Sequence, residues 1–508
     1  MNYLIGVDIG TQGTKAALYD EQCTLVSDAF EQSKLIYPEA GAVEQDAQEI
    51  FESVLRTISE VVKNSKIPPK DVAAVGMDGQ MAGIMGIDKN GIAVTPYDSW
   101  LDTRCGKYRG HFLSYGEDTV IALTGAPVTY AHGPKILWWK HERPDIYKNI
   151  YRFVQPASYC AMRMCGLAGD DAFIDHTYLH FSGFADTSKK QWSKELLKEL
   201  NVEPYKMPAI VKPYDIVGKL TDETAKLCGL LPGTPVVAGC GDTAASSLGA
   251  GITRDGLLFD VSGSASVLAC AINKFSPDIK YKTMMCCPSV IDGLYSSMAY
   301  IGGGGMCIKW LRDDILHGAF SYGDLNAMAE KIAPGSGDLL FMPHFSGRVC
   351  PNDSLVRGSY VNLSWMHGTA HLYRAILEGI AYEYGIYSDI IKELLPSLVF
   401  ERAINIGGGS RSGLFRQIKA DVLNVPVSTI NITDTATLAC CIIAGYGIRL
   451  YADMAAPIEK AAILCETTEP QHEHTEFYRR RKEIYAELFP SLRGVYSKLQ
   501  ELKQWGAD

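Results

Sequence analysis

Two strand–glycine turn–strand patterns, about 250 residues apart, constrain the fold of this chain more than any other feature. The first is "NYLIGVDIGTQGTKAALY" at residues 2–19, and the second is "GLLFDVSGSASVLAC" at residues 256–270. Each runs from a β-rich segment through Gly with Thr or Ser into another β-rich segment, as a hairpin does. Because 508 residues are too many for one hydrophobic core, the repeat predicts two domains built alike, 1–250 and 251–508.

Helix-like and strand-like segments alternate through both halves. "DAQEIFESVLRTISEVV" has apolar residues at helical spacing behind Asp46, which we expect to cap the helix. "HGTAHLYRAILEGIAYEYGIYSDIIKELL" predicts a long helix with a wide apolar face, and the "RRRK" cluster near the C-terminus predicts a solvated helix face. Strand-like runs are "VAAVGMD", "TPVVAGC" and "RAINIGG". Strands alternating with helices predict an α/β protein.

The net charge of the chain limits the kinds of partner that it can bind. A formal net charge of -10 argues against nucleic acid or an anionic membrane as the main partner. A small anionic ligand remains compatible, because backbone amides can bind it locally. The segment "MNYLIGVDIG" has no basic leader pattern, and no apolar run reaches the ~18 residues of a membrane helix. The sequence therefore predicts a cytoplasmic protein.

Four glycine-rich segments could hold phosphate groups. Glycines let backbone N–H groups approach an anion, and hydroxyl groups add further donors. None of the four matches the Walker pattern or GxGxxG. By itself the first could equally be a plain glycine hairpin, and the second favours a bulged hairpin. Two hairpin turns and two glycine–helix junctions in both halves together favour a nucleotide in a cleft between domains. Their residues are Asp8, Thr11, Gln12, Thr14 and Lys15; Gly263 and Ser264; Gly303 and Gly304; Gly408, Gly409 and Ser412.

Asp242 is a lone acid among small residues in "PVVAGCGDTAASSLGAG". It follows a predicted strand and stands at the start of a predicted helix. A carboxylate there could accept a proton from a substrate hydroxyl, while the helix N-terminus favours negative charge on a phosphoryl group. The alternative, equally compatible with the local pattern, is that Asp242 only caps the helix.

Five blocks together resemble the FGGY carbohydrate kinases. They are "GVDIGTQGTKAAL", "AGCGDTAASSLGAG", "GDLLFMPHFSGRVCPNDSLVRGSY", "LYRAILEGIAYE" and "IGGGSRSGLFRQIKADVLNVPV". The similarity extends from the first strand to about residue 450, in the same order. Within the family, "DGQMAG" and "YDSWLDTR" are most similar to the xylulokinase branch.

The resemblance implies two actin-like ATPase (ribonuclease-H-like) domains around an interdomain cleft that binds ATP and a sugar. Asp242 would be the general base and Asp8 would help to hold Mg²⁺. The turns Thr11–Lys15 and Gly263–Ser264 would face the phosphates. The glycines Gly303, Gly304, Gly408 and Gly409, with Ser412, would border the adenosine, and the residues near the sugar would be Gln80, Met81, Ala82, Trp100 and Asp102.

One position departs from the xylulokinase pattern. The usual motif is GQMHG, and here Ala82 replaces the His, which removes a ring that could bond a sugar hydroxyl. The predicted reaction is ATP-dependent phosphorylation of a hydroxyl, terminal in a ketopentose such as xylulose. Alternatives are a family kinase for ribulose, a tetritol or an aldonate, a silent sugar- and nucleotide-binding protein, or a chaperone- or actin-type ATPase on the same fold. The pattern is also compatible with a homodimer.

Overall fold

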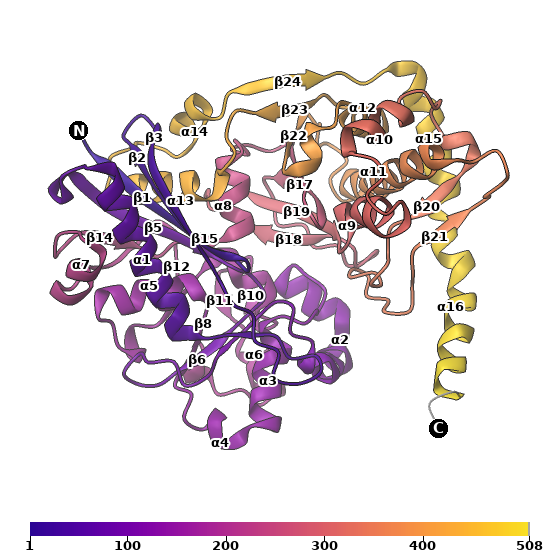
Figure 1. The fold of residues 1–508 in the computed structure, drawn as a ribbon. Helices are drawn as coiled ribbons and strands as arrows, with labels where there is room; N and C mark the ends of the chain where they lie inside the picture. The colour runs from indigo at the N-terminus through magenta and orange to yellow at the C-terminus, as the bar shows by residue number, and fades with distance from the viewer. Residues whose placement is uncertain (506–508) are drawn as a thin grey trace.

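Two lobes, each built around a seven-stranded sheet, make up the computed structural model, which describes residues 1–505 (Figure 1). The first sheet has the order β13–β14–β5–β1–β2–β3 with β15 beside β5, and the second has β18–β19–β17–β16–β22–β23–β24. In chain order the strands of the first sheet are β1 (Tyr3–Ile9), β2 (Gly13–Asp20), β3 (Leu25–Gln32), β5 (Val72–Gly79), β13 (Ile216–Lys219), β14 (Pro235–Val237) and β15 (Cys240–Gly241). Those of the second are β16 (Leu257–Ser262), β17 (Ser266–Ile272), β18 (Met285–Pro288), β19 (Tyr295–Ile301), β22 (Arg402–Ile406), β23 (Val427–Ile430) and β24 (Leu464–Thr468).

The two predicted hairpins occupy matching places in the two sheets. In the first lobe β1 pairs antiparallel with β2 and parallel with β5. In the second lobe β16 pairs antiparallel with β17 and parallel with β22. The α/β class and the repeated architecture predicted from the sequence are therefore confirmed.

Helices cover both faces of the first sheet. On one face lie α1 (Ala47–Ser65), α5 (Pro156–Cys165) and α7 (Asp222–Cys228), which pack on the odd-numbered residues of β1. Asp46 caps α1 as predicted, because its carboxylate accepts a hydrogen bond from the Glu49 amide at 2.8 Å. On the other face lie α8 (Asp242–Gly249) and α13 (Thr435–Gly447).

Helix α13 comes from the second half of the chain but packs on the first sheet. Figure 1 shows the orange α13 beside the indigo strands of the first lobe. Its residues Leu438, Ala439 and Ile442 share one apolar cluster with Leu4 and Ala74. The backbones approach so closely that a methyl group added at Gly6 would lie 2.0 Å from the carbonyl oxygen of Thr437. The first lobe is thus completed by a helix almost 200 residues beyond its last strand.

The second sheet carries its main helical layer on one face. This layer contains α9 (Gly304–Trp310), α10 (Tyr322–Ala329), α11 (Thr369–Leu394), α12 (Gly413–Leu423) and α15 (His472–Ala486). The predicted long helix is α11. The opposite face packs against the first lobe, where Phe259 and Met298 join a cluster with Ala126 and Ile252. The lobes therefore share an apolar contact beneath the cleft.

The remaining elements surround these two cores. The "RRRK" segment, predicted to be a solvated helix face, is only partly exposed. Arg479 and Arg480 are exposed, whereas Arg481 and Lys482 are buried and pair with Asp338 and Asp389. Within residues 1–505 no helix has the length and apolar content needed to cross a membrane. The other elements are β4 (Glu44–Gln45), β6 (Met85–Ile87), β7 (Tyr97–Asp98), β8 (Arg152–Val154), β9 (Phe173–Asp175), β10 (Ala185–Asp186), β11 (Gln191–Trp192), β12 (Ala209–Val211), β20 (Leu340–Met342), β21 (Ser359–Val361), α2 (Arg109–Thr124), α3 (His132–Glu142), α4 (Pro144–Tyr147), α6 (Lys194–Glu199), α14 (Ala455–Ala461) and α16 (Leu488–Trp505).

Candidate active site

Three aspartates meet at the carboxyl ends of adjacent parallel strands of the first sheet. Asp8 on β1 is in register with Asp78 on β5, and Asp78 is in register with Cys240 on β15. Asp242 follows directly after β15 as the first residue of α8. This edge is where ligands bind in open α/β sheets.

A fourth aspartate reaches the same place from the second half of the chain. Side chains alternate across a strand, so Asp8 and Asp78 point to the face that α13 covers, as Leu4 and Ala74 do. Asp434 caps α13 by accepting from the Thr437 amide. Lys15, the register partner of Asp8, forms an ion pair with Asp434 at 2.8 Å. The result is a carboxylate-rich cluster with one nearby lysine.

Burial and like charge shape the protonation of this cluster. Burial raises the pKa of Asp8 to about 6; the Asp78 side chain opposes that shift, the Asp434 charge adds to it, and the Lys15 cation lowers it. The pKa of the fully buried Asp78 lies well above its ordinary value because of burial and the charge of Asp8. Asp78 accepts a weak hydrogen bond from the Cys440 thiol at 3.1 Å, and its Oδ1 has no partner within the described residues.

Asp242 is half-buried at the head of α8. Burial, with a smaller contribution from the Asp8 charge, raises the pKa of its carboxyl group to about 7. The carboxylate accepts only from the amide of Thr243 at 2.5 Å and from its hydroxyl at 3.1 Å, among residues 1–505. A capping side chain normally accepts from a residue two or three further on, so this geometry favours a chemical role over a capping one.

The first glycine turn is linked to two of the residues predicted near the sugar. The Trp100 indole N–H donates to the Thr11 hydroxyl at 2.9 Å, and that hydroxyl donates to the Gln80 side-chain oxygen at 2.9 Å. Met81 lies against Gly241, because a methyl group added at Gly241 would be 2.6 Å from the Met81 Cε. Ala82 follows with a left-handed φ of 62°. Thr11, Gln80, Met81 and Trp100 are therefore brought to the edge that carries Asp242.

Two predicted site residues have their polar groups directed elsewhere. The Thr14 side chain is buried and its hydroxyl is bonded to the Ser53 hydroxyl of α1 at 2.7 Å. It lies on the opposite face of β2 from Lys15, as strand alternation requires. Asp102 is buried and accepts from the Val43 amide and the Arg104 guanidinium at 3.0 and 2.8 Å. The structure gives both residues structural contacts and does not bring them to the cluster, while the neighbouring Gln12 is exposed at the turn.

The second glycine turn meets both glycine–helix junctions. The Met306 amide donates to the Ser264 carbonyl at 3.1 Å, next to Gly303 and the buried Gly304. A methyl group added at Gly409 would lie 2.7 Å from the Ser262 Cβ. Gly408 is exposed, and Ser412 caps α12 by accepting from the Phe415 amide at 3.2 Å. The structure therefore gathers the second-half segments predicted to bind a nucleotide.

Both turns present unused donors. Among residues 1–505, the amides of Thr11, Gln12, Gly263, Ser264 and Ala265 donate no hydrogen bond. Successive free amides of this kind form an anion site, since the N–H groups point at the ligand at no cost in rearrangement. The two turns are thus suited to phosphate oxygens.

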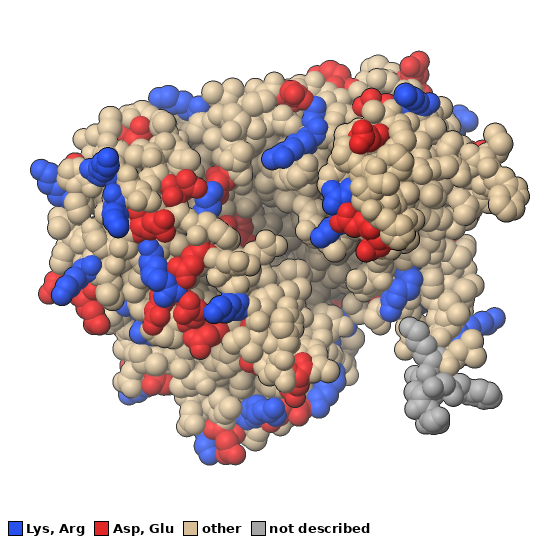
Figure 2. Space-filling model, viewed as in Figure 1, with Lys and Arg blue, Asp and Glu red and all other residues tan. Residues whose placement is uncertain are grey.

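A hollow separates the lobes on the face shown in Figure 2. Close to Asp242, a cavity between the lobes is lined by Met81, Thr243, Ala244 and Ser247 of the first lobe and by Phe259, Ala269 and Met298 of the second. Its other lining residues are Thr177, His180, Cys287, Pro288, Ser289 and Ser296, so within the described chain it is lined by no Lys or Arg.

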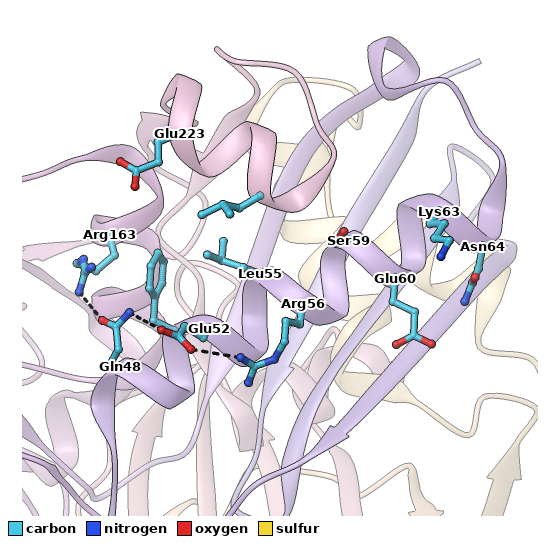
Figure 3. Close-up of a pocket in the computed structure, with 12 residues that line it drawn as sticks. Gln48, Glu52, Leu55, Arg56, Ser59, Glu60, Lys63, Asn64, Arg163 and Glu223 are labelled. Atoms are coloured by element: carbon cyan, nitrogen blue, oxygen red, sulfur yellow. Dashed lines mark hydrogen bonds and ion pairs between the residues drawn. The ribbon is translucent and has the colours of Figure 1, made fainter.

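A surface groove lies elsewhere, along α1 (Figure 3). It runs along the outer side of α1, between Gln48 and Asn64, and also touches α5 and α7. This is the face of the first sheet opposite Asp8 and Asp78. Its central Arg56 is already paired with Glu31, Glu49 and Glu52. The groove is therefore distinct from the carboxylate cluster and is not the candidate site.

Comparison with known proteins identifies the family. Models of the N-terminal and C-terminal domains of the FGGY family of carbohydrate kinases match residues 3–249 and 291–448. The chain belongs to the FGGY family of carbohydrate kinases. As such it is an enzyme that uses a carbohydrate and ATP.

Individual relatives are distant but cover the whole chain. The xylulose kinase of Bacillus subtilis (strain 168) is 25% identical, with 99% of this chain and 100% of that protein covered. The gluconokinase of the same organism is also 25% identical, covering 99% and 98%. A ligand-bound xylulose kinase from Lactobacillus acidophilus superposes with a TM-score of 0.90 at 23% identity, covering 98% and 100%. These likenesses establish the two-domain actin-like fold.

Sequence reasoning missed two of the four aspartates. The signal for Asp434 is a repeated Asp-Thr-Ala at a helix start, at residues 242–244 and again at 434–436. The signal for Asp78 is an acid at the end of a strand-like run, as at Asp8. Both required knowledge of which strands and helices are neighbours.

Proposed function

We propose that this kinase transfers the terminal phosphoryl group of ATP to a terminal hydroxyl of a ketopentose such as xylulose. The first half of the chain, 1–250, supplies the acceptor side of the cleft, and the second half, 251–508, supplies the nucleotide side. The observation that carries the proposal is the place of Asp242: a half-open carboxylate with a pKa of about 7, beside an interdomain cavity. A base of that strength is suited to accept a hydroxyl proton near neutral pH.

The chemistry follows from the residues around the cleft. The acceptor oxygen forms a bond to the γ-phosphorus as the bond from that phosphorus to the bridging oxygen of ADP breaks. The hydroxyl proton passes to the Asp242 carboxylate. The free amides of the turns at Thr11 and Gly263 hold the phosphate oxygens and stabilise their charge, which is the main task of the protein in phosphoryl transfer. Closure of the lobes excludes water from the reacting groups.

The carboxylate cluster suits a magnesium ion. Within the described residues no three His, Cys, Asp or Glu side chains form a complete metal cage. Mg²⁺ needs none, because one or two carboxylates and the phosphates of the substrate complete its shell. Asp8 would hold the ion, with Asp78 behind it, whose Oδ1 is buried without a partner. The ion would supply positive charge where phosphates meet the aspartates.

The residues predicted to lie near the sugar favour a neutral acceptor. A sugar acid such as gluconate would need a cation for its carboxylate, and Gln80, Met81, Ala82 and Trp100 supply none. Ala82, which replaces the His of the xylulokinase pattern, keeps another ketose or polyol as the second candidate.

The test is an ADP-release assay with a panel of acceptors. It should include D-xylulose, ribulose, tetritols and gluconate, each with MgATP. We expect the highest kcat/KM with a ketopentose. Turnover with gluconate alone would reject the neutral-acceptor proposal, and nucleotide binding without turnover on any acceptor would favour a silent binding protein.

A further inference from the structure

A buried ion pair lies beneath the second glycine turn. Lys419 of α12 and Asp260 of β16 are both fully buried, and the ammonium nitrogen is 2.5 Å from the Asp260 Oδ2. Asp260 points to the helical layer because it alternates with Phe259, which faces the first lobe. Desolvation lowers the pKa of Lys419, while Asp260 opposes that shift. A charge pair in this position requires an explanation beyond packing, since buried pairs contribute little net stability.

Ser262 connects the pair to the turn. Its hydroxyl receives hydrogen bonds from the Lys419 ammonium and from the Asn405 amide, the latter at 3.0 Å, and it donates to the Asp260 Oδ1 at 3.1 Å. The Tyr384 hydroxyl donates to the same Oδ1 at 3.0 Å. The two charges and the Ser262 hydroxyl therefore all have partners, while among the described residues the Asn405 Oδ1 has none. Buried hydrogen bonds of this kind hold the ion pair and Ser262 in one arrangement.

Ser262 is also the last residue before the turn Gly263–Ala265. A methyl group added at Gly407 would be 2.8 Å from the Ser262 carbonyl oxygen, so the chain directly after β22 packs tightly against the Ser262 backbone. On the other side the Met306 amide holds the Ser264 carbonyl. The turn is fixed at its base and at one flank, and its free amides remain available to a ligand.

We propose that Lys419 is a positioning residue for nucleotide binding: with Asp260 and Ser262 it fixes the Gly263–Ala265 turn so that its amides bind the phosphates. This inference rests on the proposed function, because it requires that a nucleotide occupies that turn. It assigns to Lys419 no contact with the nucleotide. The ion pair acts through Ser262, and its purpose is the orientation of three backbone N–H groups.

Two variants test the inference without leaving a lone buried charge. Ser262→Ala keeps the ion pair and removes its link to the turn. The double variant Asp260→Leu with Lys419→Met removes both charges together and fills the space with apolar side chains. The control is Lys482→Met, which removes a buried lysine of α15 that pairs with Asp389 in the same lobe.

The measurements are ADP affinity by calorimetry and KM for ATP and for the acceptor. We expect ADP to bind about tenfold more weakly to both test variants, the order of one or two misplaced hydrogen bonds. The KM for ATP should rise in step, while the KM for the acceptor and the ADP affinity of the control stay unchanged.

The outcomes separate the two proposals. Unchanged ADP affinity in Ser262→Ala and in the double variant would overturn the positioning role and leave the kinase proposal intact. An equal rise in both KM values would mean a general structural role and would also overturn it. Failure of the unchanged protein to bind ADP would overturn both proposals.

Discussion

The two glycine hairpins are alike in topology but differ in how the charge of their aspartate is balanced. Asp8 of β1 and Asp260 of β16 both lie one or two residues before the end of a strand, on the face that helices cover. In the second lobe the covering helix α12 supplies Lys419, and the charge of Asp260 is fully compensated in the interior. In the first lobe the covering helix α13 supplies Cys440 to Asp78 and Asp434 to Lys15.

The difference separates two tasks on one architecture. The second hairpin has a buried, charge-paired network beneath its turn, which suits it to hold a ligand in place. Beside the first hairpin, the pKa values of the Asp8 and Asp242 carboxyl groups are raised, and the Asp78 Oδ1 has no partner among the described residues. This cluster is therefore suited to a cation and to proton transfer. The surrounding sheet and helices hold these carboxyl groups close together in spite of their raised pKa values.

The largest effect is expected at Asp242, in the carboxylate cluster beside the first hairpin. Asp242→Asn removes the proton acceptor and should lower kcat by about 10²–10⁴-fold. ADP affinity should stay within about twofold, because the turn amides are untouched. Single-turnover rates and calorimetry on the same preparation check both expectations. A loss of less than tenfold would mean that Asp242 only caps α8.

Removing the negative charge of Asp260 or of Asp8, which occupy matching positions, should change the free energy of unfolding in opposite ways. Asp260→Asn leaves the Lys419 cation buried without a counter-ion and should destabilise the fold by about 3–5 kcal/mol. Asp8→Asn should leave stability at pH 8 equal or higher. Its pKa of about 6 exceeds the ordinary value of 3.8, so stability falls as the pH rises from about 4 to about 6, and the full cost is present at pH 8.

Denaturant unfolding of both variants checks this contrast. Asp8→Asn should also raise the Mg²⁺ concentration needed for half-maximal activity by at least about tenfold, as loss of a group that holds or orients a metal does. Equal destabilisation by the two substitutions would contradict the division between a reactive and a supporting hairpin.

The pH dependence of the rate should report the raised pKa of Asp242. The base is active when ionised, and its pKa is about 7, so kcat/KM for the acceptor should be constant above that value. Below it, the rate should fall about tenfold for each pH unit. Rates between pH 5.5 and 9 at saturating MgATP test this. A rate that stays constant down to pH 5.5 would show that the carboxylate keeps its ordinary acidity.

The smallest effect is expected at Ala82, where the chain departs from the xylulokinase pattern. If a ketopentose is the natural acceptor, Ala82→His should change the KM for D-xylulose by less than about threefold, since one added hydrogen bond contributes little net free energy. The left-handed φ at Ala82 tolerates His. A tenfold or greater gain would point to another natural acceptor.

The sequence was informative wherever the pattern was local. The hairpins, the Asp46 cap, α11 and the position of Asp242 after a strand were all predictable from spacing and residue type. Strand alternation could also have shown that Thr14 and Lys15 face opposite sides of β2, so that only one of them reaches the cluster.

The rest depended on contacts between distant segments. Asp434 is close to Lys15 only because α13 returns to the first sheet, and Lys419 meets Asp260 across about 160 residues. Asp102 belongs to the motif predicted to lie near the sugar. Its carboxylate instead pairs with Arg104 in the protein interior. Charge pairing of this kind is decided by packing, which no local pattern encodes.

The return of α13 to the first sheet has a consequence for dividing the protein. A fragment that stops at residue 250 would lack the helix that covers Leu4, Ala17 and Ala74, and a wide apolar sheet face would be bare. We expect such a fragment to aggregate, and co-expression with residues 251–508 to restore solubility, as fractionation of the expressed halves would reveal. We therefore expect the two halves of the chain to fold together as one cooperative unit.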